Sequence, residues 1–181
     1  MTEEDRARWD ARYARLGPPS VGAAGPPPWL VPYADLFPTA GHAFDLACGP
    51  GSDAVWLAAR GVDVRGLDVS AVAIDQARDL ARRSGVEQRC RFELVDLDDG
   101  LPAGPPVAAV LCHKFRDRRL DAAIVERLAP GGLLAITALS EVGAGPGRFR
   151  VPPGELVAAF AALEVITRGE RDGEAWLLAR A

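Results

Sequence analysis

The chain has 181 residues, 49% of them hydrophobic and 25% charged, which is the composition of a globular protein with a sizeable core. The formal net charge of -4 provides no broad basic field, so we expect no nucleic-acid partner. The 3 cysteines and 2 histidines show neither disulfide nor metal-ligand spacing, and no metal site is predicted. We find no pattern of a signal peptide or a membrane span, and we expect a cytoplasmic monomer or homodimer without a membrane partner.

The N-terminal part of the chain differs from the rest, and we predict a helical lid or cap segment over residues 1–40. Trp9 and Tyr13 lie at helical spacing in a polar stretch that runs from Glu3 to Leu16 and ends at Gly17. A connection rich in Gly and Pro follows, and residues 29–37 then favour a short apolar helix.

From residue 41 to residue 181, short apolar runs alternate with helical patterns. Strands are predicted over 43–47, 62–69, 91–96, 107–112 and 133–138, and a final strand pair over 163–167 and 175–179. Helices are predicted over 53–60, 71–84, 120–128 and 154–161, the second of them capped by Ser70 and stopped by Gly85. This alternation predicts an α/β fold of the Rossmann-like, doubly wound kind: a mainly parallel seven-stranded sheet, helices on both faces, and an antiparallel C-terminal strand.

A glycine-containing loop, Asp45-Leu46-Ala47-Cys48-Gly49-Pro50-Gly51, lies between the first predicted strand and its helix. Gly49 and Gly51 would let the backbone turn tightly and come close to a ligand. The helix that begins near Ser52 adds free amide groups and a positive dipole end, which favour an anionic group. An isolated Gly-x-Gly is often only a structural turn, but this one follows a strand, opens a helix and is followed by an acidic residue.

That acidic residue is Asp68, which ends the second predicted strand 17 positions after Gly51. A carboxylate there can accept both hydroxyl hydrogens of a ribose, although it could instead favour the following helix N-terminus. Asp96 closes the third predicted strand and could accept the exocyclic amine of an adenine. Because Asp98 and Asp99 follow it, a plain acidic loop is the alternative interpretation.

In their order and spacing, these three elements resemble the class I S-adenosylmethionine-dependent methyltransferases over roughly residues 41–140. Within that class the chain is similar to small bacterial proteins related to the tellurite-resistance and thiopurine methyltransferases. This finer likeness lies in Trp9-Asp10-Ala11-Arg12-Tyr13, in Asp45-Leu46-Ala47-Cys48-Gly49, and in Leu111-Cys112-His113-Lys114-Phe115 with Asp117-Arg118.

The resemblance implies a methyltransferase domain over residues 41–181 with S-adenosylmethionine as cofactor. Its methionine part would contact Asp45 and the loop backbone at Ala47, Cys48, Gly49 and Gly51. Asp68 and Val69 would hold the ribose, and Asp96 and Leu97 would bind the adenine. His113 would lie near the sulfonium and the acceptor, and the N-terminal segment would fold over the cofactor.

The acceptor is expected to be a small molecule, such as a thiol, a chalcogen oxyanion or a similar soft nucleophile. His113 is the candidate catalytic base because the pKa of a histidine lies near neutrality, and a histidine packed at a strand end is the alternative. Trp9, Tyr13, Trp29 and Arg150 are candidates for lining the acceptor pocket or the lid. The aromatic members of this set could equally anchor the N-terminal segment on the core.

Two other functions fit parts of the same pattern. The loop can also be written Gly49-x-Gly51-x-x-Ala54, a fingerprint that nicotinamide-dependent oxidoreductases tolerate. The position of Asp96 and the short chain weigh against that activity. A protein that binds S-adenosylmethionine without catalysis is the other alternative, because the chain offers few catalytic side chains.

Overall fold

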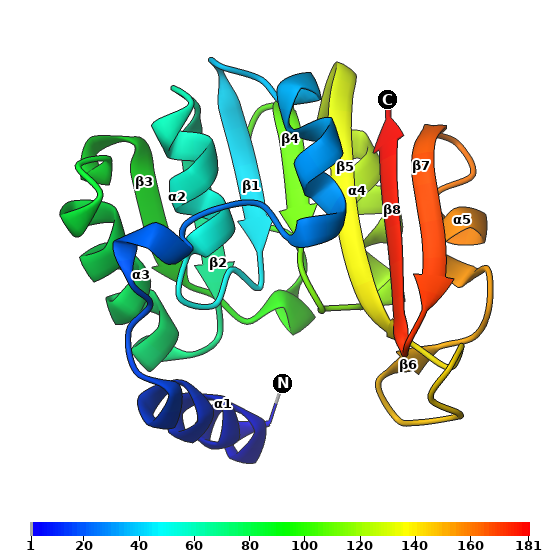
Figure 1. The fold of residues 1–181 in the computed structure, drawn as a ribbon, viewed down its shortest axis with the longest axis horizontal. Coiled ribbons are helices and arrows are strands. Elements are labelled where there is room, and N and C mark those ends of the chain that lie inside the picture. The colour runs from blue at the N-terminus through cyan, green and yellow to red at the C-terminus, as the bar shows by residue number, and fades with distance from the viewer. Residues whose placement is uncertain (1) are drawn as a thin grey trace. The chain divides into compact units, whose positions relative to one another are not determined.

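The computed structural model describes residues 2–181 and contains the strands and helices that the pattern predicts (Figure 1). The chain divides into two compact units, the first ending at Gly100 and the second beginning at Leu101. Each unit has its own strands, helices and buried residues, and each is described by itself below.

The first unit contains three parallel strands, β1 (His42–Leu46), β2 (Asp63–Asp68) and β3 (Cys90–Leu94), arranged in the order β3-β2-β1. Helix α2 (Ser52–Ala59) joins β1 to β2 and packs along β2, while α3 (Ala71–Arg83) joins β2 to β3 and packs along β3 (Figure 1). Two short 3-10 helices precede and follow β3 along the chain, Glu87–Arg89 and Leu97–Asp99.

Helix α3 shows why the helix boundaries could be predicted. The Ser70 side chain accepts a hydrogen bond from the Ala73 N–H and caps the first turn. One face of the helix is buried, and Gly85 with φ +71° follows the last turn. Polar residues occupy the other face, so burial of the apolar stripe against β2 and β3 holds the helix.

The N-terminal helix α1 (Glu3–Leu16) has the predicted bounds and is capped by the side chain of Thr2. None of its residues is buried, so core burial does not hold it in place. Two 3-10 helices follow, Val21–Ala23 and Pro28–Leu36, and the second is the short apolar helix that was predicted. Leu30 and Phe37 pack this segment into the core of the first unit.

The second unit contains β4 (Val107–Cys112), β5 (Leu128–Ser140), β7 (Glu164–Arg171) and β8 (Glu174–Arg180) in the order β4-β5-β8-β7. β4 and β5 are parallel, whereas β8 is antiparallel to both of its neighbours. Helices α4 (Asp121–Arg127) and α5 (Glu155–Ala159) and the 3-10 helix Arg118–Leu120 complete the unit. Its core is built largely from apolar side chains of β4, β5 and β8 together with Phe160.

The predicted fold class, mostly parallel strands with an antiparallel C-terminal strand, is confirmed. All seven predicted strands are present, with one addition and two marked extensions. The addition is β6 (Arg150–Val151), which pairs with β5. β7 continues to Arg171 rather than 167. β5 begins at Leu128 rather than 133, because a register shift accommodates Pro130-Gly131-Gly132 between its two paired parts. None of the helices in residues 2–181 is long and apolar enough to span a membrane.

Candidate functional site

The loop after β1 has the left-handed backbone that its glycines indicate. Gly49 has φ +52° and Gly51 has φ +82°, and the Gly51 N–H donates to the Cys48 carbonyl at 3.0 Å. A Cβ on Gly51 would lie 2.8 Å from the Cβ of Ala77, so α3 packs against the loop too closely for any other residue. Ala47 has φ +51°, a conformation that costs a non-glycine residue energy and that the sequence did not indicate.

Asp68, at the carboxyl end of β2, holds this loop. Its Oδ2 accepts a hydrogen bond from the Gly49 N–H at 2.8 Å, and its Oδ1 accepts one from the Ser70 N–H at 2.9 Å. Burial raises the pKa of the carboxyl, and these N–H donors oppose that change. A carboxylate has about four lone-pair sites, so Asp68 keeps acceptor capacity for a ligand beyond these two bonds. Val69 beside it is half-buried.

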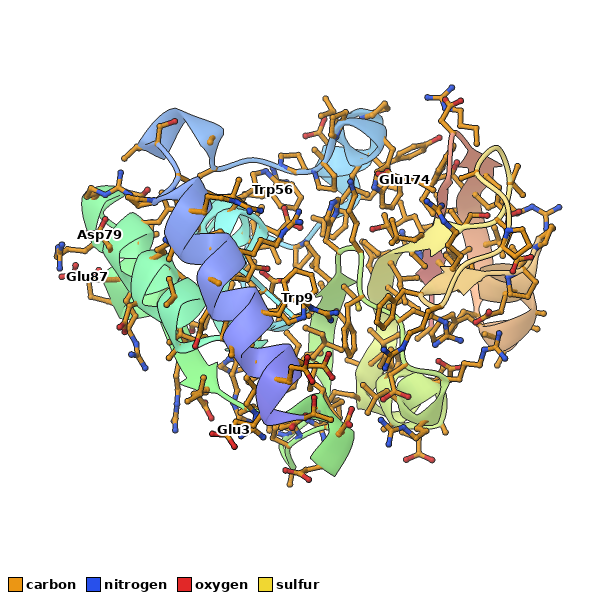
Figure 2. All side chains as sticks on the ribbon, turned by 90° about the horizontal axis from the view of Figure 1, so that it is seen from below. Glu3, Trp9, Trp56, Asp79, Glu87 and Glu174 are labelled. Carbon is orange, nitrogen blue, oxygen red and sulfur yellow. The ribbon has the colours of Figure 1, made fainter. Side chains whose placement is uncertain are left out.

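Helix α1 lies beyond the carboxyl ends of β1, β2 and β3 and runs alongside α3 (Figures 1 and 2). One oxygen of Asp10 accepts hydrogen bonds from the Ser70 hydroxyl and from the Val72 N–H. Gln76 donates to the Tyr13 carbonyl at 3.0 Å. The Tyr13 hydroxyl lies 3.0 Å from where a Cβ of Gly49 would be, so α1 contacts the glycine loop directly. Trp9 stacks on Tyr13 with ring centroids 5.8 Å apart.

Two further carboxyl groups lie at this loop, one predicted and one not. Asp45 of β1 is 1% exposed, and its Oδ2 has no hydrogen-bond partner among the described residues. Asp53, in the first turn of α2, interacts electrostatically with it. Burial raises the pKa of Asp53 to about 7, and burial together with Asp53 raises the pKa of Asp45 well above its ordinary value. Burial also raises the pKa of the Cys48 thiol, which is therefore neutral at pH 7.

The residues expected to bind adenine follow β3. β3 ends at Leu94, so Asp96 lies in the loop beyond the strand and not at its last position. One oxygen of Asp96 caps the next 3-10 helix through the Asp98 N–H, and the other accepts from Arg6 of α1 at 2.8 Å. Although partial burial acts in the opposite direction, these bonds contribute to holding the pKa of Asp96 below its ordinary value. Leu97 is buried.

His113 belongs to the second unit, directly after β4. Its Nδ1 is buried and lacks a hydrogen-bond partner within residues 2–181. Burial lowers its pKa, as does Lys114, so the imidazole is neutral at pH 7. The next residue fixes the loop, because the Lys114 N–H donates to Oγ1 of Thr137, a buried residue of β5, at 2.8 Å.

The remaining candidates for a lid or acceptor pocket are held differently. Trp29 lies in the 3-10 helix of the first unit, half-buried, and its Nε1 has no hydrogen-bond partner in the described part of the chain. Arg150, in the second unit, donates to the Ser140 carbonyl at 2.6 Å and to the Gly173 carbonyl at 3.1 Å. Its guanidinium therefore joins the end of β5 to the turn between β7 and β8, and a contact with substrate stays a prediction.

In the first unit the structure thus brings together Gly49, Asp45, Asp68 and Tyr13. Sequence reasoning missed Asp10 and Asp53. Asp10 stands inside the Trp9-Asp10-Ala11-Arg12-Tyr13 motif, and this could have indicated a capping carboxyl. Asp53 in the first turn of a helix fits an ordinary interaction with the helix dipole, so nothing in its sequence position marked it.

Comparison with known proteins agrees with this fold. A family model described as a methyltransferase domain matches residues 43–132. The methyltransferase GfsG of Streptomyces halstedii is 35% identical over 112 residues, which are 58% of this chain and 40% of that protein. The crystal structure of TehB from Haemophilus influenzae is 19% identical with a TM-score of 0.72, covering 83% of this chain and 60% of that one.

A further solved structure covers almost the whole chain. It is described as "Conversion of a Disulfide Bond into a Thioacetal Group during Echinomycin Biosynthesis", is 25% identical, has a TM-score of 0.68, and covers 99% of this chain and 93% of that one. The chain belongs to the class I S-adenosylmethionine-dependent methyltransferases. It spans about two fifths of the length of two curated relatives that it matches.

Proposed function

We propose that this protein transfers a methyl group from S-adenosylmethionine to a small-molecule acceptor. The observation that carries the proposal is the convergence of the left-handed glycine loop with two buried carboxyl groups, Asp45 and Asp68. Oδ2 of Asp45 is a buried acceptor without a partner among residues 2–181, and the Asp68 carboxylate keeps acceptor capacity beyond its bonds to Gly49 and Ser70. Both features suit a ligand that carries an amine and hydroxyl groups.

Different residues would bind the three parts of the cofactor. Asp45 and the loop backbone from Ala47 to Gly51 would hold the methionine part, and Asp68 would accept the ribose hydroxyl hydrogens. Asp96 and Leu97 would bind the adenine, with Val69 against its ring. When bound, the cofactor supplies a methyl group on a positively charged sulfur that is already activated for transfer. The protein's contribution is then to position the acceptor and to keep water away.

Helix α1 would act as the lid of this site. Its hydrogen bonds reach Ser70, Val72 and Gln76, and its Tyr13 hydroxyl lies on the glycine loop. These contacts hold α1 although none of its residues is buried, so it can open without disrupting a core. We expect Trp9 and Tyr13 to exclude water once the cofactor is bound.

We propose a thiol or another soft nucleophile as the acceptor. The supporting observations are the few candidates for a catalytic base in the sequence and the similarity to the solved structure whose description names the conversion of a disulfide bond into a thioacetal group. A soft anion needs no strong base, and the neutral imidazole of His113 is suited to accepting the proton of a thiol. Any further role of His113 stays a prediction.

The test is a screen of methyl acceptors with release of S-adenosylhomocysteine as the readout. Thiols, selenite, tellurite, halides and small amines are offered in turn, with Asp68→Ala as the binding-deficient control. We expect turnover with a thiol or a chalcogen compound, absent from the control. Cofactor binding without turnover on any acceptor would favour the non-catalytic alternative. Calorimetry showing binding of NAD but not of S-adenosylhomocysteine would favour the oxidoreductase.

A further inference from the structure

The turn that follows β4 contains a residue with a strained backbone. Lys114 has φ +56°, a left-handed conformation that costs energy in any residue with a side chain. Glycine and asparagine adopt this conformation most readily, and neither occurs in residues 112–118. Strain of this kind persists only where the surrounding structure holds it, and it is most frequent at functional sites. The contacts of Lys114 therefore decide where the turn lies.

Side chains of β5 and β8 hold this turn. The Lys114 N–H donates to Oγ1 of Thr137 in β5 at 2.8 Å, and Thr137 is 2% exposed. The Lys114 ammonium lies 2.5 Å from a carboxylate oxygen of Glu174 in β8, but these side chains are 46% and 42% exposed, so the ion pair contributes little. The Cys112 thiol donates weakly to the Phe115 carbonyl at 3.4 Å. The buried hydroxyl of Thr137 is therefore the main anchor of the turn.

The bond from Lys114 to Thr137 also acts on His113. The Lys114 N–H and the His113 carbonyl belong to one planar peptide group, so fixing the N–H fixes the rotation about the Cα–C bond of His113. The imidazole of His113 is half-buried and forms no hydrogen bond with any of residues 2–181. No bond of its own holds the ring in place, so its position depends on the backbone that Thr137 anchors.

We infer that Thr137 is a positioning residue that holds His113 in place for methyl transfer. The inference rests on the proposed function, in which His113 accepts the proton of a thiol. A proton acceptor must lie within hydrogen-bond reach of the proton that it takes. A displacement of about 1 Å is enough to slow such a step strongly, so the anchor of the turn controls the rate although it does not touch the substrate.

Three substitutions separate the hydroxyl of Thr137 from its volume. Thr137→Val keeps the shape of the side chain but leaves the Lys114 N–H without this acceptor, whereas Thr137→Ser keeps the acceptor. Thr167→Val is the matched control, because Thr167 is half-buried in β7 and its side chain forms no hydrogen bond with any of residues 2–181. A melting curve of each variant shows that it is folded.

The first measurement is the titration of the two histidines, His42 and His113, by proton NMR, which needs no turnover. The variant His113→Asn assigns the two resonances. Burial and Lys114 lower the pKa of His113, whereas Glu174 raises it. A ring released from its place gains contact with water, so Thr137→Val should raise the pKa of His113 towards that of a histidine in water. Thr137→Ser and Thr167→Val should not move it, and the His42 resonance should be the same in every variant.

The second measurement is the rate of methyl transfer to dithiothreitol, or to the acceptor that the screen identifies. We expect Thr137→Val to lower kcat by about tenfold or more, while KM for S-adenosylmethionine stays within about twofold. Thr137→Ser should restore most of the rate. In the His113→Asn background, Thr137→Val should change kcat by less than about twofold, because the residue through which it acts is absent.

An unchanged titration of His113 in a folded Thr137→Val variant would overturn the positioning role while leaving the proposed function intact. An equal loss of rate with and without His113 would do the same. Should Thr137→Val not fold, hydrogen exchange of the Lys114 amide in the unmodified protein decides: we expect slow exchange, and exchange as fast as in an exposed loop would overturn the anchor. Absence of turnover with every acceptor of the screen would overturn the proposed function, whereas the NMR titration judges the position of His113 separately.

Discussion

Replacing Gly49 by alanine tests the contact between α1 and the glycine loop. Gly49 has φ +52°, where an alanine costs about 1–2 kcal/mol more than a glycine. The new Cβ would also lie 3.0 Å from the Tyr13 hydroxyl, which must move, and we assign about 1 kcal/mol to that crowding. Together these effects should lower the free energy of unfolding by about 2–3 kcal/mol, which corresponds to about 5–10 °C in the melting temperature of a protein of this size.

Thermal unfolding followed by circular dichroism measures this loss, and two further variants separate its parts. Tyr13→Phe removes the crowded hydroxyl, so it should restore about 1 kcal/mol in the Gly49→Ala background. Gly85→Ala is the matched control, because Gly85 has φ +71° but no atom within 4 Å of its Cβ position. Gly85→Ala should lose only the part of the stability that an alanine with a left-handed backbone costs. Equal losses for Gly49→Ala and Gly85→Ala, with no restoration by Tyr13→Phe, would refute the placement of α1 on the loop.

Three other predictions concern single side chains. Asp10→Ala removes the acceptor of the Ser70 and Val72 bonds, so stability should fall by about 1 kcal/mol and amide exchange in α1 should accelerate; unchanged exchange would contradict the anchoring role. His113→Asn should slow methyl transfer. In the unmodified protein the rate of methyl transfer should rise with pH as His113 loses its proton, and should be level above pH 7 because burial lowers the pKa of this histidine. A rate that falls between pH 6 and 8 would exclude the neutral imidazole as the base. Because the folded protein raises the pKa of Asp53 above its unfolded value, its ionisation destabilises the ligand-free fold increasingly from about pH 4 to 7. Asp53→Asn should therefore raise the melting temperature at pH 8 more than at pH 5; a larger gain at pH 5 would contradict the burial of this carboxyl.

The features of this structure that could be predicted are those set by residues close together in the sequence. The Ser70 cap and the Gly85 stop bound α3, and Gly17 ends α1, because each signal acts within one helical turn. The fold class followed from the alternation of such elements. The glycine loop and Asp68 were also predictable, because a ligand site at the ends of parallel strands needs small residues and a carboxylate at fixed places.

Features that depend on distant partners could not be predicted. β5 continues through Pro130-Gly131-Gly132, which reads as a turn, because pairing with β4 carries the strand across a register shift. Asp10 bonds to a residue 60 positions away, and the raised pKa of Asp53 comes from burial that no local pattern reveals. The ion pair of Asp96 with Arg6 likewise depends on where α1 lies, not on the sequence around β3.

The most direct test of the central claim is a calorimetric titration of S-adenosylhomocysteine into the unmodified protein and into Asp68→Ala. The account predicts one binding site per chain in the unmodified protein. It also predicts at least about a thirtyfold weaker affinity in the variant, from the loss of charge-assisted bonds to the ribose. A melting curve of the variant checks that the fold survives loss of the Gly49 and Ser70 bonds. Absence of binding to the unmodified protein at millimolar ligand, or equal affinity in a folded Asp68→Ala variant, would contradict the account.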